Sequence, residues 1–85
     1  MRVVYSEPCL KQLRKIDKPE AKRIICCMKE IEMLDNPRSR GKALVNNLKG
    51  LWRYRVGDWR IICDIVDEEI IINVLELGHR REIYD

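Results

Sequence analysis

Six side chains in the second half of the chain suggest a chemical activity. They are three closely spaced arginines, followed near the C-terminus by a histidine, an arginine and a tyrosine: Arg53, Arg55, Arg60, His79, Arg80 and Tyr84. A guanidinium offers a fixed fork of donors that fits phosphate oxygens and keeps its charge. Such a cluster stabilises the negative charge of a phosphoryl transition state, and histidine can exchange protons near neutral pH. The set therefore favours phosphodiester chemistry.

An RNA substrate would supply its own nucleophile, the 2′-hydroxyl. The reaction then needs an acid, a base and charge stabilisation, but no metal. The four cysteines have no paired CxxC spacing and the chain has one histidine, so we expect no zinc site. The sequence also lacks the carboxylate cluster of a two-metal nuclease. We expect metal-independent chemistry without a cofactor.

Each residue also has a simpler interpretation. A single arginine on a sheet usually just projects into solvent. That interpretation is weaker for three arginines, because two of them lie directly opposite one another and repel. On spacing alone, His79 is more often a structural residue at the end of a strand. Tyr84 more often stacks on a base or closes a hydrophobic edge. Whether His79 or Tyr84 is the acid or the base stays open here.

Residues 51–77 alternate in polarity with period two and contain turn signals at Gly57-Asp58 and Asp67-Glu68. They predict a three-stranded antiparallel meander with two-residue turns. The expected register pairs Arg55 with Arg60 and Arg53 with Ile62, and then Val66 with Glu69, Cys63 with Ile72 and Arg60 with Leu75. One face is apolar and should hold the core. The other carries the three arginines and ends with Leu75 and Leu77.

The first half predicts one strand and two helices. Residues 2–6 are β-branched and aromatic, as in a strand that pairs with the meander at long range. Ser6 should cap a short helix to residue 16, and Asp17 a second helix to about residue 34. This order predicts an α+β domain with both helices on the apolar face of a single four-stranded sheet. The arginines would then lie on the uncovered face.

Length and composition indicate one globular domain, residues 1–85. No apolar run is long enough to span a membrane and residues 1–5 do not resemble a signal peptide, so we expect a cytoplasmic protein without a membrane partner. The net charge of +3 hides an asymmetry, because positions 38 to 60 contain seven basic residues and one acidic residue. The basic side chains outside the arginine trio are candidates for RNA binding: Arg38, Arg40, Lys42, Lys49 and, in the tail, Arg81.

Two motifs together resemble a known family. The run LKGLWRYRVGDWRII at 48–62, followed by GHRREIY at 78–84, closely resembles the RelE group of the RelE/ParE toxin superfamily. The resemblance covers essentially the whole chain. It implies a RelE-like fold and a toxin of a toxin–antitoxin pair, an endoribonuclease that cuts messenger RNA in the ribosomal A site. It also implies a cognate antitoxin, through which alone operator DNA would be contacted.

Carried over by position, the residues around the scissile phosphate would be Arg53, Arg55, Arg60, Arg80 and Tyr84. Family members with a lysine at the position of Arg53 can use it as the base, whereas arginine is not deprotonated in proteins. The resemblance therefore implies another base, with His79 first and Tyr84 second. Two alternatives remain, a gyrase-inhibiting toxin of the ParE branch and a non-catalytic module that binds RNA or antitoxin.

Overall fold

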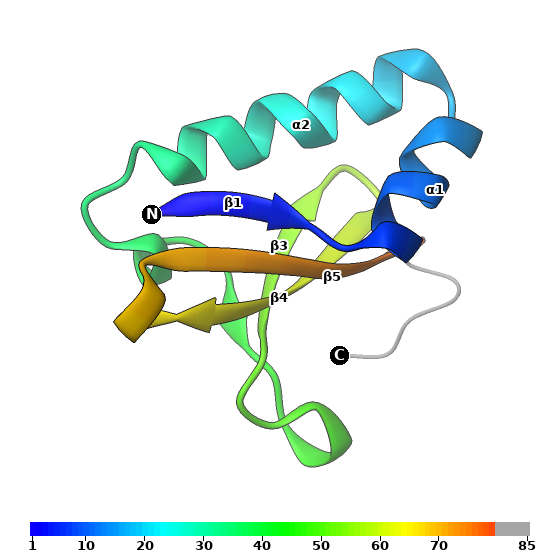
Figure 1. Ribbon diagram of the computed structural model, residues 1–85. Coiled ribbons are helices and arrows are strands. Elements are labelled where there is room, and N and C mark those ends of the chain that lie inside the picture. Colours follow the sequence, from blue (N-terminus) through cyan, green and yellow to red (C-terminus); the bar gives the residue numbers. More distant parts are fainter. Residues whose placement is uncertain (80–85) are drawn as a thin grey trace.

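The computed structural model describes residues 1–79 and shows two helices on one side of a single sheet (Figure 1). The helices and strands are β1 (Arg2–Tyr5), α1 (Glu7–Lys15), α2 (Lys18–Glu32), β2 (Lys42–Ala43), β3 (Trp52–Val56), β4 (Trp59–Val66) and β5 (Ile71–His79). Short 3₁₀ helices cover Pro37–Ser39, Asn46–Leu48 and Asp67–Glu69. The predicted α+β class and the placement of both helices on one face are confirmed. Neither helix within residues 1–79 has the length and apolar character that a membrane span requires.

The sheet has five strands in the order β1-β5-β4-β3-β2. The first strand pairs in parallel with β5, which confirms its predicted long-range contact. The prediction of four strands was wrong by one, because Lys42 and Ala43 pair antiparallel with Arg53 and Trp52. A strand of two residues is too short to show an alternation of polar and apolar residues in the sequence. Only its pairing with β3 reveals it as a strand.

The first hairpin has the predicted register, with Arg55 opposite Arg60 and Arg53 opposite Ile62. Its turn begins at Gly57, whose φ of 59° lies in the left-handed region that glycine adopts without strain. A two-residue turn of this kind sets the register of both strands. Local chemistry therefore determined which side chains face each other here.

The predicted register of the second hairpin was wrong. Residues 67–69 form a 3₁₀ turn and Ile70 is left-handed, so Val66 pairs with Ile71. A bulge follows, because Ile62 pairs with Glu76 and Cys63 with Val74, leaving Leu75 between them. One extra residue reverses the two faces of a strand. Leu77 consequently lies in the core, 1% exposed, and not beside the arginines as expected.

The core lies between the sheet and the helices. Its buried residues are Cys9 from α1, Ile24, Met28 and Ile31 from α2, and Tyr54, Ile61, Cys63, Ile72, Val74 and Leu77 from the sheet. Ser6 caps α1 as predicted, since its Oγ accepts the N–H of Cys9 at 3.2 Å. Asp17 precedes α2 but makes no side-chain cap. With the core on this side, the opposite face of the sheet is left for the arginines.

Candidate functional site

Four basic side chains share the sheet face opposite the helices: Lys42, Arg53, Arg55 and Arg60. Arg55 and Arg60 face each other across β3 and β4. Arg53, two residues from Arg55, faces Lys42 of β2. Because side chains alternate along a strand, all four project to one side. We call these four residues the basic face.

Arg53 is the most enclosed charge of this face. Its exposed fraction is 6%, and its cross-strand neighbour Ile62 is 2% exposed. Among residues 1–79, it is the only charged residue that is buried. An arginine keeps its charge wherever it lies. The centre of the basic face therefore carries a permanent positive charge.

Two hollows lie along the basic face. The larger, about 320 Å³, is lined by Arg40, Gly41, Arg53, Tyr54 and Arg55. The smaller, about 120 Å³, is lined by Arg55, Gly57, Asp58 and Arg60. Arg55 borders both. An extended anion such as a nucleic-acid backbone that followed the two hollows would pass Arg53, Arg55 and Arg60 in succession.

The segment before β2 is fastened to β3 by two aromatic side chains. The hydroxyl of Tyr54 donates to the Pro37 carbonyl at 2.6 Å, and Nε1 of Trp52 donates to the Arg40 carbonyl at 2.8 Å. Burial raises the pKa of Tyr54 to about 12, so its hydroxyl stays protonated near neutral pH. The sequence predicts only a basic loop here. It gives no sign that the polar ends of two sheet aromatics hold the segment in place.

The predicted RNA-binding residues divide into two groups. Arg38 donates to both carboxylate oxygens of Asp67, at 3.0 and 2.9 Å, and these hydrogen bonds hold the pKa of the Asp67 carboxyl below its usual range. Arg40 pairs with Glu30 at 3.2 Å while lining the larger hollow. Lys42 joins the basic face through β2, and Lys49 is exposed. The structure thus brings Lys42 to the arginines. It directs the guanidinium of Arg40 to Glu30 and Cys27 of α2, on the helix side, and that of Arg38 to the β4–β5 connection.

The tail candidates are placed only in part. His79 is the last residue of β5 and faces Trp59, which lies on the helix side of the sheet. The structure therefore does not bring its imidazole among the guanidinium groups. Arg80, Arg81 and Tyr84 lie outside the described residues. Within residues 1–79, no three His, Cys, Asp or Glu side chains are grouped to hold a metal ion.

Residues 3–84 match the family described as ParE toxin of type II toxin–antitoxin system, parDE. Among curated proteins no sequence match was found. The structure resembles the toxin–antitoxin complex RelBE2 from Mycobacterium tuberculosis, with 27% identity, a TM-score of 0.68, and 93% of this chain and 96% of that chain covered.

Two further solved structures are similar. The archaeal RelE-RelB complex from Pyrococcus horikoshii OT3 matches with 25% identity and a TM-score of 0.72, and 93% of each chain is covered. The intact E. coli RelBE toxin–antitoxin complex also has a TM-score of 0.72, at 14% identity, with 92% of this chain and 94% of that chain covered. At that identity the likeness concerns the fold alone.

Proposed function

The chain belongs to the RelE/ParE superfamily of type II toxin–antitoxin toxins, and we propose that it is an endoribonuclease that cuts messenger RNA on the ribosome and so inhibits translation. One observation carries this proposal. Arg55 and Arg60 face each other directly, with Arg53 and Lys42 beside them on the face that the helices leave open. Four cations so close together favour a polyanionic partner.

The basic face suits the charge changes of phosphodiester cleavage. Arginine donors can hold a scissile phosphate bidentately, and they stabilise the added negative charge of the transition state. In an RNA substrate the 2′-hydroxyl is the nucleophile, so the toxin supplies charge stabilisation and proton transfer without a cofactor. We assign phosphate contacts to Arg53, Arg55 and Arg60, with Arg80 of the tail as the fourth.

The remaining roles follow from position and charge. Lys42 faces Arg53 and would bind the RNA backbone beside the scissile phosphate. Arg40 lines the larger hollow with Arg53 and Arg55 and would contact the backbone there. Lys49 and Arg38 would contribute more distant phosphate contacts, and the sequence makes Arg81 a further candidate for RNA binding. His79 and Tyr84 are the candidates for proton transfer.

The proposal includes a partner and a place of action. The M. tuberculosis, P. horikoshii and E. coli structures are toxin–antitoxin complexes, and we propose that this toxin likewise has a cognate antitoxin that blocks its basic face. It would act in the cytoplasm, on ribosomes and messenger RNA. It would reach operator DNA only through the antitoxin.

The decisive experiment is cleavage of messenger RNA on purified, programmed ribosomes, with RNA ends mapped by primer extension. Arg60→Ala should reduce the cleavage rate by roughly 10²- to 10³-fold, as expected for the loss of one preorganised donor. Arg14→Ala, which removes an exposed arginine from α1, is the matched control and should cut at the wild-type rate. Cuts that are absent on ribosomes, or unchanged in Arg60→Ala, would contradict the proposal.

A second function, gyrase inhibition, is favoured by one specific observation. The family that residues 3–84 match is described as ParE toxin, and the gyrase-inhibiting branch shares this fold. Purified gyrase with supercoiled DNA separates the two functions. Stabilised gyrase–DNA cleavage complexes in the presence of the wild-type protein, together with intact messenger RNA on ribosomes, would select gyrase inhibition.

The third alternative is a module that binds RNA or antitoxin without catalysis. It would show RNA binding that weakens steeply with salt, because phosphate contacts release counterions. It would show neither RNA cuts nor trapped gyrase, and its expression would not arrest growth. The same set of assays therefore separates all three functions.

A further inference from the structure

The end of β5 belongs to a cluster in which Glu20, Trp59 and His79 lie on the helix side of the sheet and Asp58 lies in the turn between β3 and β4. We call these four residues the Trp59 cluster. The rings of Trp59 and His79 meet edge to face, with centroids 5.5 Å apart and planes at 88°. Nε1 of Trp59 donates to Oε2 of Glu20 at 3.1 Å. Nε2 of His79 lies 4.0 Å from Oδ2 of Asp58.

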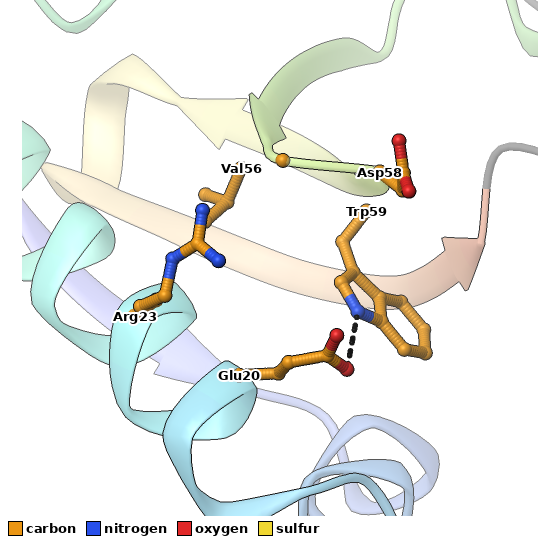
Figure 2. A pocket seen from close by; sticks show the side chains of 6 residues that line it. Glu20, Arg23, Val56, Asp58 and Trp59 are labelled. Atoms are coloured by element: carbon orange, nitrogen blue, oxygen red, sulfur yellow. Dashed lines mark hydrogen bonds between the residues drawn. The ribbon is translucent and has the colours of Figure 1, made fainter.

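This cluster joins three elements that are distant in sequence. Glu20 comes from α2, Asp58 and Trp59 from the β3–β4 hairpin, and His79 from β5. Figure 2 shows Glu20 reaching from α2 to the indole of Trp59, while the carboxylate of Asp58 points away from Glu20. A cavity of about 150 Å³ lies between α2 and the hairpin. Arg23 also reaches the hairpin, because a Cβ on Gly57 would lie only 3.2 Å from its Nη2.

The Trp59–His79 contact and the basic face lie on opposite sides of the sheet at the same strand ends. Along β4, Trp59 faces His79 and the next residue, Arg60, faces Gly78. Since neighbouring side chains point to opposite faces, the imidazole and the guanidinium of Arg60 project in opposite directions. Asp58 is the link, because it approaches His79 and also lines the smaller hollow with Arg55 and Arg60.

This geometry limits the ability of His79 to transfer a proton at the basic face. A general acid or base must come within roughly 2.6–3.2 Å of the atom that exchanges the proton, directly or through one water. The His79 side chain is only 33% exposed and packs against an indole on the face away from the arginines. Its ring therefore fits a packing role better than a proton-transfer role.

We propose that His79 is a positioning residue: its ring packs on Trp59 and fixes the end of β5 beside the hairpin that carries Arg55 and Arg60. The proposal rests on the proposed function only in taking the basic face as the site of toxicity. It leaves Tyr84 as the remaining candidate for proton transfer. It also makes the aromatic edge of His79, and not its ionisation, the property that activity requires.

The test replaces His79 by a ring that cannot carry a proton. His79→Phe keeps an aromatic edge for Trp59, whereas His79→Ala removes it. We expect His79→Phe to cut messenger RNA on ribosomes within about threefold of the wild-type rate, with the same pH–rate profile. We expect His79→Ala to lose tenfold or more, and to add little further loss in a Trp59→Ala background. Such non-additivity is typical of residues that act through one contact.

His79→Gln tests whether a loss of activity reflects loss of the ring or loss of the fold. It keeps polarity and bulk without the ring, and it should lose activity at an unchanged urea midpoint. The proposal is overturned if His79→Phe is as inactive as His79→Ala, or loses one limb of the pH–rate profile. It is also overturned if His79→Gln is fully active.

Growth arrest after induction, measured for the same variants, separates this proposal from the proposed function. If the wild type arrests growth without cutting messenger RNA, the nuclease proposal fails. The ranking of His79→Phe above His79→Ala in growth arrest then still tests the positioning role.

Discussion

At the scale of single residues, Gly41 decides how closely the segment before β2 approaches β3. Its φ is +86°, in the region that favours glycine. A Cβ there would lie 2.5 Å from the carbonyl oxygen of Arg53 and 2.5 Å from Nε1 of Trp52. Neither contact is possible, so a side chain must push the segment outward. Lys42 would then move away from Arg53.

Gly41→Ala should therefore destabilise the protein on the order of 3 kcal/mol, combining backbone strain with steric overlap. Gly50→Ala is the matched control, because Gly50 also has a positive φ of +96° but no atom within 4 Å of its Cβ position. It should cost only about 1 kcal/mol. Urea unfolding of both variants checks the prediction. Equal losses would show that φ alone matters and that the close approach does not.

At the scale of elements, β5 is longer than the strand beside it. β1 ends at Tyr5, which pairs with Val74, so β5 continues to His79 without a neighbouring strand on that side. There, the side chains of Ser6, the N-cap of α1, and of Gln12 in α1 bond to the backbone of β5 in place of a strand. The Ser6 hydroxyl donates to the Leu75 carbonyl at 2.8 Å, and the Gln12 amide both donates to the Leu77 carbonyl at 2.6 Å and accepts its N–H at 3.1 Å.

These contacts close an edge that would otherwise present unpaired backbone groups. They also hold the part of β5 that ends in His79. Ser6 and Gln12 thus bond to the backbone of β5 at the bulge residue Leu75 and at Leu77, two residues before His79. These hydrogen bonds need both the segment around α1 and β5, since no residue within β5 can supply them.

Gln12→Ala removes both hydrogen bonds to Leu77 and leaves its backbone groups without these partners. We expect a loss of roughly 1–3 kcal/mol in the free energy of unfolding. The Leu77 amide should also exchange faster with deuterium than the amides of β4. Lys11→Ala, at an exposed neighbouring position of α1, should change stability by about 0.5 kcal/mol or less. Unchanged protection of the Leu77 amide in Gln12→Ala would contradict this account.

At the scale of the whole molecule, the core contains ionisable groups that folding keeps neutral. Burial raises the pKa of Cys9 to about 11, of Tyr5 and Tyr54 to about 12, and that of Cys63 still further in the same direction. In the unfolded chain these groups ionise at lower pH, near 8.5 for a thiol and 10 for a phenol. Their contribution to stability is therefore complete below about pH 8.5 and is lost as the pH rises toward 11 and 12.

The free energy of unfolding should accordingly decrease at alkaline pH. Replacing one buried thiol should make that decrease smaller. In Cys9→Ala, the loss of unfolding free energy between pH 7.5 and 10.5 should be smaller than in the wild type by on the order of 2 kcal/mol. Cys26→Ala removes an exposed thiol and should follow the wild-type curve. Urea unfolding under reducing conditions at three pH values measures both. If stability falls equally with pH in Cys9→Ala and the wild type, burial of the Cys9 thiol does not contribute to the alkaline loss of stability.

Much of this fold could be predicted from the sequence, because the signals involved are local. The alternation in residues 51–66 and the two-residue turn at Gly57 placed Arg53, Arg55 and Arg60 on one face, with Arg55 opposite Arg60. The cap at Ser6 likewise depends on a residue three positions away. Neighbours within a few positions determine such features, whatever the rest of the chain does.

Tertiary structure alone decided where the rest of the site lies. β2 exists only because β3 offers an edge to Lys42 and Ala43, and the bulge at Leu75 is a feature of the pairing between β4 and β5. That single extra residue turned Leu77 into the core and set His79 against Trp59. The physical reason is that strand register is fixed by hydrogen bonds between distant segments, and a shift of one residue exchanges the two faces of a sheet.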